Sequence, residues 1–153
     1  MKRLKPFIIF LIINYGALGI GSWLMNNGPQ TEWYTSLNQA PWTPPGWVFG
    51  VAWTTIMLCF SIYMAFLYLK NPSMKVKVLF SIQFVLNVIW NYIFFNKHLI
   101  ALGLAVIISL TIVVALFMFI YKNELKVKTL LILPYFLWLC IATSLNAYIL
   151  LNN

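Results

Sequence analysis

LIALGLAVIISLTIVVALFMFIY, residues 99–121, is the stretch that decides the fold, because it contains no charged residue and no histidine. About 20 such residues cross a hydrocarbon core of ~30 Å as an α-helix. Four other apolar runs have a similar length, and none shows the alternating polarity of a membrane β-barrel strand. The sequence therefore predicts an all-α membrane protein, a five-transmembrane-helix bundle that forms a single domain over 1–153. We place the helices at about 6–25, 46–69, 76–96, 99–121 and 128–151.

The composition of the chain excludes an ordinary soluble domain. Of its 153 residues, 63% are hydrophobic, 18% are aromatic and only 8% are charged, whereas a soluble domain carries about 25% charged residues. Disorder requires the opposite composition. The ten basic residues are too few and too scattered for a groove that follows nucleic-acid phosphates. We therefore expect membrane lipid and hydrophobic small molecules as partners, and no nucleic acid.

The basic residues instead indicate how the chain is oriented. With five spans, the N-terminus and the second and fourth connections lie on one side of the membrane, and this side holds nine basic residues against Lys97 alone on the other. By the positive-inside rule, the N-terminus is cytoplasmic and the C-terminus outside, in what we expect to be a bacterial cell membrane. Contact with anionic lipid follows as a side effect. The first run is long and no small-x-small site in it is followed by a soluble domain, so we expect it to remain as a helix.

The first connection, NNGPQTEWYTSLNQAPWTPP at residues 26–45, does not resemble an ordinary loop. It is stiffened by proline and carries large aromatic rings, whereas flexible linkers are small and polar. One interpretation is an aromatic anchor at the membrane interface. The other is a lid over an apolar cavity between the helices. We favour the lid, because interfacial aromatic residues are found at helix ends rather than in the middle of a loop.

Three of the predicted helices carry rings or amides at helical spacing, which places them on one face of each helix. Amides in hydrocarbon need partners, so these faces are expected to point into the bundle. A purely structural role, in which each amide joins two helices for about 1 kcal/mol, is the simpler alternative. Three such faces beneath an aromatic loop favour a pocket. The residues are Phe49, Trp53 and Ile56; Gln83, Asn87, Trp90, Asn91 and Phe94; and Tyr135, Trp138, Ala142, Leu145 and Asn146.

Conventional catalytic signatures are absent from the sequence. There is no paired carboxylate, nucleophile–base pattern or phosphate-binding loop. His98 is the only histidine, and Cys59 and Cys140 lie in separate apolar runs. We therefore expect no metal site and no cofactor. Pro134 falls within the fifth predicted span and is expected to kink it.

A set of Trp, Pro and Asn positions extends over almost the whole chain and resembles one known family. The set is Trp33-Tyr34, Ser36-Leu37, Pro41-Trp42, Pro44-Pro45, Trp47 and Trp53; Gln83, Asn87, Trp90 and Phe94-Phe95; and Pro134-Tyr135, Trp138, Ala142, Leu145-Asn146 and Tyr148. In these positions the chain is similar to the TspO/MBR family of tryptophan-rich sensory proteins, which includes the mitochondrial translocator protein, or peripheral-type benzodiazepine receptor.

This resemblance implies a membrane receptor or sensor, frequently a homodimer. Members bind porphyrins such as protoporphyrin IX and haem, and drug-like ligands of the benzodiazepine and isoquinoline carboxamide type, in a pocket capped by the first loop. Carried onto this chain, the ligand-binding residues are Trp33, Trp42, Phe49, Trp53, Asn87, Trp90, Trp138, Ala142 and Leu145.

The resemblance also leaves two alternative functions open. Some bacterial members are credited with light- and oxygen-dependent breakdown of protoporphyrin IX, and on this reading the chain is an enzyme with Trp53 and Trp138 as its catalytic residues. Transport of tetrapyrroles is the other alternative. It is disfavoured because the sequence shows neither an inverted repeat nor an intramembrane coupling residue.

Overall fold

Five long helices make up the bundle in the computed structural model, which describes residues 4–153. Each is long and apolar enough to cross a membrane, so the predicted five-helix all-α fold is confirmed. Lys2 and Arg3, two of the basic residues used to predict orientation, lie outside the described residues. The helices are α1 (Leu4–Leu24), α3 (Gly46–Lys70), α4 (Met74–Asn91) with its π-helical extension η2 (Tyr92–Asn96), α5 (Ile100–Ile120) and α7 (Leu133–Asn152).

Short helical elements occupy the two longer connections. The first connection contains η1 (Gly28–Gln30) and α2 (Glu32–Ser36), and α6 (Lys122–Leu125) and η3 (Lys126–Leu131) precede α7. The predicted kink at Pro134 is wrong, because α7 begins at Leu133 and the proline lies in its first turn. A proline is well tolerated there, since the first N–H groups of a helix have no partner within it.

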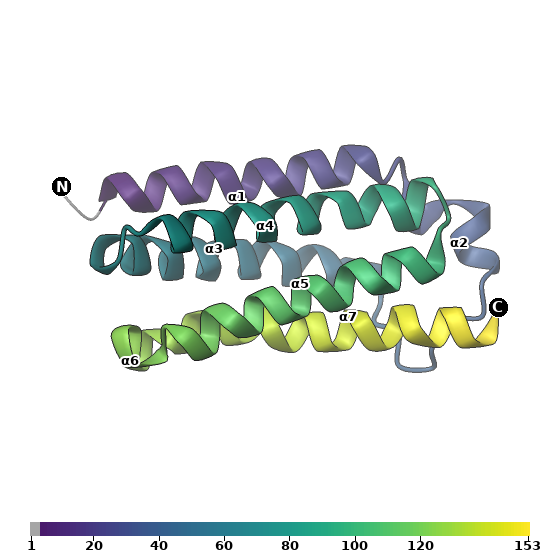
Figure 1. Cartoon of the computed structure of the whole chain (residues 1–153). Helices are drawn as coiled ribbons and strands as arrows, with labels where there is room; N and C mark the ends of the chain where they lie inside the picture. Colours follow the sequence, from purple (N-terminus) through teal and green to yellow (C-terminus); the bar gives the residue numbers. More distant parts are fainter. Residues whose placement is uncertain (1–3) are drawn as a thin grey trace.

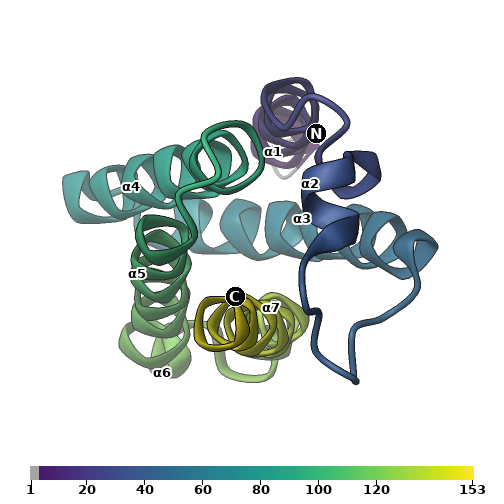
Figure 2. The ribbon, with the colours of Figure 1, turned by 90° about the vertical axis from the view of Figure 1, so that its right-hand side faces the viewer.

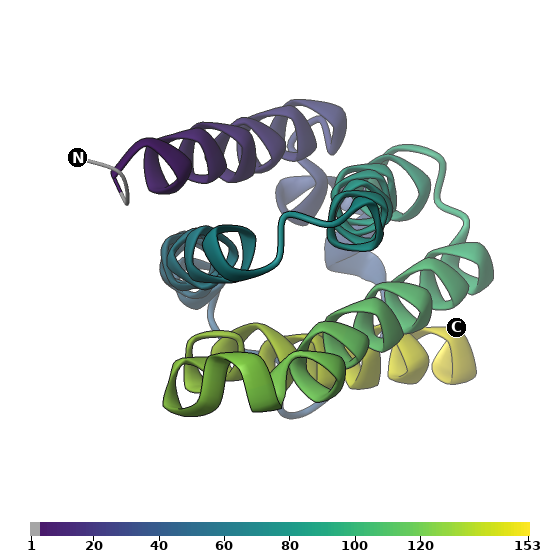
Figure 3. The same ribbon diagram turned by 60° about the vertical axis from the view of Figure 1, so that its left-hand side comes forward.

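Seen from the side, the helices extend in one general direction, and the start of α1 lies at the opposite end of the bundle from the C-terminus (Figure 1). Helix α1 packs against α3 and α4, and α5 packs against α4 and α7. The first connection covers one end, which we call the lid end. Figure 3 brings forward the other, where α1 begins, α3 joins α4, and α6 lies.

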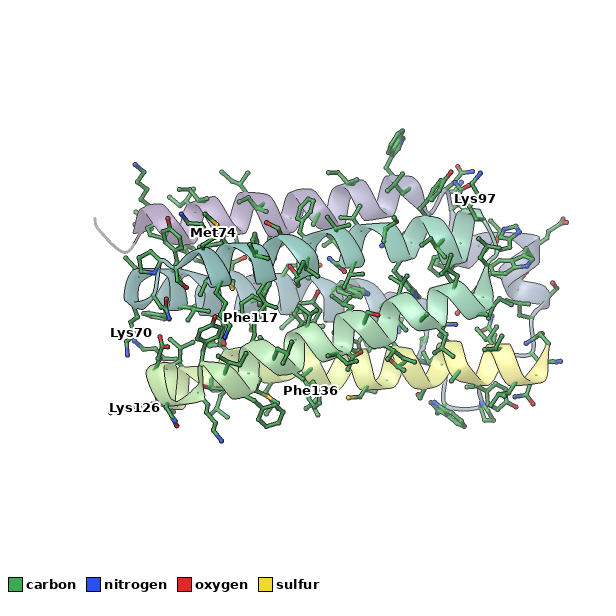
Figure 4. All side chains as sticks on the ribbon, viewed as in Figure 1. Lys70, Met74, Lys97, Phe117, Lys126 and Phe136 are labelled. Atoms are coloured by element: carbon green, nitrogen blue, oxygen red, sulfur yellow. The ribbon has the colours of Figure 1, made fainter. Side chains whose placement is uncertain are left out.

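The basic side chains separate between these two ends. Figure 4 shows Lys70 and Lys126 at one end of the bundle and Lys97 at the other. We call the former the basic end; among the described residues it holds Lys5, Lys70, Lys75, Lys77, Lys122, Lys126 and Lys128. The charge asymmetry of the sequence is therefore an asymmetry of the folded bundle.

An aromatic core fills the half of the bundle near the basic end. Phe60, Tyr63, Phe117 and Tyr135 are almost completely buried there. Phe60 lies edge-on to Tyr135 with ring centroids 5.2 Å apart, and the Tyr63 hydroxyl donates to the Phe117 carbonyl at 2.8 Å. At the lid end, Phe94 and Phe95 form a second, smaller group of packed rings with Trp33 and Tyr34, and an open space remains beside it beneath the lid.

Candidate ligand-binding site

A cavity of about 620 Å³ lies at the lid end, between α1, α3, α4 and α7. Its size falls within the range of about 300–1,000 Å³ that is typical of small-molecule sites. The structure brings seven of the nine predicted ligand-binding residues to its wall. These seven are Phe49, Trp53, Asn87, Trp90, Trp138, Ala142 and Leu145.

Helical spacing explains why these residues share one space. Phe49 and Trp53 are four residues apart on α3, and Trp138, Ala142 and Leu145 follow at intervals of four and three on α7. Residues at these intervals lie above one another on a single helix face. Gly50 also lines the cavity, and a Cβ atom built there would meet nothing within 4 Å. The cavity is therefore open beside the α3 backbone at Gly50.

The rings of the wall support one another in defined pairs. Trp90 stacks on Phe94 with ring centroids 5.3 Å apart and an interplanar angle of 9°. Trp138 lies edge-on to Phe49, with centroids 5.3 Å apart. Trp53 lies edge-on to Tyr135, with centroids 6.0 Å apart. The cavity is thus walled by rings that are already packed, and it presents a largely preformed aromatic surface.

Two amides near the cavity have the structural role that the simpler alternative predicted. The side chain of Asn146 accepts from Trp90 Nε1 at 3.2 Å and donates to the Ile100 carbonyl at 3.2 Å, so it joins α4, α5 and α7. Gln83 Nε2 donates to the Tyr135 hydroxyl at 2.6 Å. These hydrogen bonds join the helices. Both side-chain atoms of the Asn146 amide are paired, whereas Gln83 does not line the cavity and its Oε1 has no partner among the described residues.

Asn87 differs from these amides. It lines the cavity and is only 6% exposed, yet its side chain makes no hydrogen bond within residues 4–153. Its amide atoms are not among the fully buried atoms that lack a partner, so they border the cavity rather than the packed interior. The Asn87 amide is therefore available to orient a bound molecule.

The Trp138 indole is the second unpaired group of the wall. Its Nε1 is buried and has no hydrogen-bond partner among the described residues. By contrast, Trp90 Nε1 is paired with Asn146. The ring of Trp138 is therefore held by packing alone.

The two predicted lid residues do not line the cavity. Trp33 stacks on His98 with ring centroids 4.0 Å apart, and it lies edge-on to Phe94. Trp42 is 54% exposed, and its Nε1 donates to the Ser144 hydroxyl at 3.1 Å. Both rings attach the lid to the helix bundle without lining the cavity. Their assignment as ligand contacts stays a prediction.

Other residues of the lid reach the cavity instead. Tyr34, Gln39 and Pro44 line it, and sequence reasoning did not select them as site residues. Burial raises the pKa of the Tyr34 phenol above its ordinary value, so this group remains protonated at neutral pH. Gln39 Nε2 donates to the Tyr34 carbonyl at 3.0 Å, which links the two within the lid.

Two contacts hold the lid closed over the bundle end, where α2 lies between α1 and the C-terminal end of α7 (Figure 2). Gly28 rests on η2 so closely that a Cβ atom there would lie 2.4 Å from Phe95 Cγ. At the other side, the Asn38 backbone N–H donates to Asn153 Oδ1 at 2.8 Å, and Asn153 Nδ2 donates back to the Asn38 carbonyl at 3.2 Å. The lid is therefore docked along its length rather than hanging free.

Helix α1 contributes a wall that sequence reasoning also missed. Ala17, Leu18 and Ser22 line the cavity. They carry neither rings nor amides, so only their position shows their role. The close approach of α1 to α4 at Gly21, where a Cβ atom would lie 2.7 Å from Asn91 Nδ2, brings them there.

These features define a class of protein: an integral membrane protein whose five-helix bundle encloses an aromatic cavity beneath a docked lid. Comparison with known proteins gives the family. The model of the TspO/MBR family matches residues 8–151, so the chain belongs to the TspO/MBR family. The resemblance carried by its Trp, Pro and Asn positions is confirmed.

Relatives from distant organisms match over most of their length. The tryptophan-rich protein TspO of Archaeoglobus fulgidus is 35% identical over 157 residues, which cover 100% of this chain and 97% of that protein. The protein of the same name from Chlorobaculum tepidum is 32% identical over 141 residues, covering 90% and 89%. The translocator protein of Homo sapiens is 26% identical over 132 residues, covering 83% and 78%. The names of these relatives support a membrane receptor role.

Proposed function

We propose that the chain is a membrane receptor for porphyrins, such as protoporphyrin IX and haem, and for drug-like ligands of the benzodiazepine and isoquinoline carboxamide type. The ligand occupies the cavity beneath the lid. Flat apolar molecules fit such a wall because each aromatic pair adds about 0.5–1.5 kcal/mol beyond the burial of area.

The observation that carries this proposal is the free amide of Asn87 within an otherwise aromatic wall. Ligand sites combine apolar walls with a few polar groups that fix orientation. The Asn87 amide borders the cavity and has no hydrogen-bond partner among the described residues, so it is available to a ligand. A porphyrin offers both a ring face for Trp53 or Trp90 and a polar edge for Asn87.

A titration of protoporphyrin IX into the purified chain in detergent, followed by intrinsic Trp fluorescence, tests the proposal. Trp53, Trp90 and Trp138 all line the cavity, so a ligand bound there should quench part of the emission. The expected result is saturable quenching at one porphyrin per chain. Quenching that rises linearly without saturation would refute the receptor function.

One contact favours light-driven degradation of the bound porphyrin as a second candidate. Trp53 of the wall lies against Tyr135, with ring centroids 6.0 Å apart. The two oxidisable rings are adjacent, and an excited porphyrin in the cavity would lie beside Trp53, with dioxygen as the oxidant. Illumination of the complex in air should then convert the porphyrin absorbance into that of a new species. An unchanged rate in both Trp53→Phe and Trp138→Phe would exclude this role for the rings.

We also propose that the N-terminus is cytoplasmic and the C-terminus outside, because the basic end holds all described lysines except Lys97. A reporter active only in the cytoplasm should be inactive when fused after Asn153. Full activity of that fusion would reverse the orientation.

A further inference from the structure

A second hollow lies at the basic end, at the opposite end of the bundle from the cavity. It is a groove of about 480 Å³ between α1, α3 and the start of α4. Phe10 forms part of its floor, edge-on to Tyr68 and to Phe80 with centroids 5.9 Å and 5.1 Å apart. Ile9 and Ile13 continue the apolar surface along α1.

The charged groups of this groove are all basic. Lys5 and Lys77 line it, and Lys77 Nζ lies 5.9 Å from the ring centroid of Tyr68. The only two carboxylate side chains of the sequence, Glu32 and Glu124, are not among its lining residues. The groove therefore combines an apolar floor with two ammonium groups that no carboxylate of the lining neutralises.

The dimensions of the groove match one leaflet of a bilayer. Eight residues separate Lys5 from Ile13, which corresponds to about 12 Å of helix. One leaflet of a ~30 Å hydrocarbon core is about 15 Å deep. The ammonium groups belong to residues near the start of α1 and of α4, where lipid head groups lie, and the apolar floor extends toward the membrane centre.

We propose that this groove is a binding site for one anionic phospholipid of the leaflet at the basic end. An acyl chain lies along α1 against Phe10, and the phosphate lies between Lys5 and Lys77. Basic pockets between transmembrane helices are suited to such head groups. A second copy of the chain fits less well, because a two-fold contact centred on the groove would bring its own lysines against Lys5 and Lys77.

Native mass spectrometry of the full chain in detergent tests the proposal, with phosphatidylglycerol and phosphatidylcholine of identical acyl chains as probes. One phosphatidylglycerol should be retained in preference to phosphatidylcholine. Each lysine near an anionic head group contributes about fivefold in affinity, so Lys5→Gln with Lys77→Gln should weaken retention about 30-fold. Lys75→Gln with Lys122→Gln is the matched control, because it makes the same charge change at the same end, outside the groove.

Two further measurements separate the groove from general surface charge. Ile9→Trp keeps both lysines and fills the apolar part at a position that is 45% exposed, so it should fold and lose the lipid. Inorganic phosphate should not displace the lipid. The proposal would be overturned if the two lipids bound equally, if the two double variants lost equal affinity, or if Ile9→Trp retained the lipid. Displacement of the lipid by phosphate would also overturn it, and so would a lipid-independent dimer that is lost in Ile9→Trp. Porphyrin binding is a separate readout, since the groove and the cavity share no lining residue.

Discussion

Replacing Asn87 by leucine should weaken ligand binding, whereas replacing Asn146 by leucine should lower the stability of the fold. The two residues have the same side chain and both line the cavity. They differ in their hydrogen bonds, because Asn146 has partners on both sides of its amide and the Asn87 amide has none within residues 4–153. Leucine has the same branching as asparagine but is larger, so each exchange removes the polar atoms and adds the same apolar volume at both positions.

The expected magnitudes follow from these partners. Asn87→Leu should leave the free energy of unfolding unchanged or raise it, and should weaken porphyrin binding about fivefold, the equivalent of one hydrogen bond of about 1 kcal/mol. Asn146→Leu removes two hydrogen bonds and leaves the Trp90 N–H without its acceptor. It should therefore lower stability by about 2–4 kcal/mol.

Thermal unfolding in detergent and a porphyrin titration by Trp fluorescence measure the two effects in the same samples. The reasoning is refuted if Asn87→Leu unfolds at a markedly lower temperature with unchanged affinity, because Asn87 would then be a structural amide. It is equally refuted if Asn146→Leu is as stable as the unmodified chain.

Three further predictions concern the lid. Gly28→Ala should release the lid from η2 and speed ligand dissociation, because the new Cβ would collide with Phe95; stopped-flow fluorescence measures the rate. Removal of Asn153 should also speed dissociation, since it deletes both of its hydrogen bonds with Asn38, each of which contributes about 1 kcal/mol. The pKa of Tyr34 is raised in the folded chain, so the unfolded chain loses the phenol proton at a lower pH than the folded chain does. The contribution of Tyr34 to stability should therefore be constant below about pH 10 and fall above it. Tyr34→Phe should reduce that decline in a pH series of unfolding temperatures.

Each of these predictions has a control and a contradicting result. Gly19→Ala is the control for Gly28, because a Cβ at Gly19 meets nothing within 4 Å; equal dissociation rates in the two variants would contradict a docked lid. For the C-terminal contact, Asn153→Asp removes the hydrogen bonds that Asn153 Nδ2 donates to Asn38 and Ile149 but keeps the acceptor for the Asn38 N–H, and it should give an intermediate rate. A decline in stability that begins well below pH 10 would contradict a buried, protonated Tyr34.

The fold could be predicted from sequence because hydrocarbon leaves a chain few choices. A run such as residues 99–121 has to satisfy its backbone internally, and a helix does so. The cavity wall was predictable for a related reason, since Trp138, Ala142 and Leu145 fall on one face by spacing alone. Hydropathy does not distinguish 3₁₀ from α-helical turns, which is why Pro134 was expected within the last span rather than at its start.

The lid could not be read from the sequence in the same way. Helix α2 has five residues, too few to define a face by periodicity. Its pose depends on contacts with residues far along the chain: Asn38 bonds to Asn153 across 115 positions, and Trp33 stacks on His98. The difference between Asn87 and Asn146 was hidden for the same reason, because only the folded bundle shows which amide is already paired.

The central claim is that a flat apolar ligand binds in the cavity beneath the lid, and filling that cavity tests it most directly. Ala142 lines the cavity, whereas its neighbour Ile141 is 40% exposed on the outer face of α7. In a protoporphyrin IX titration by Trp fluorescence, Ala142→Phe should weaken binding about 10- to 100-fold, the equivalent of one overpacked side chain. Ile141→Phe should bind as the unmodified chain does. Undiminished binding in Ala142→Phe would place the ligand elsewhere and contradict the account.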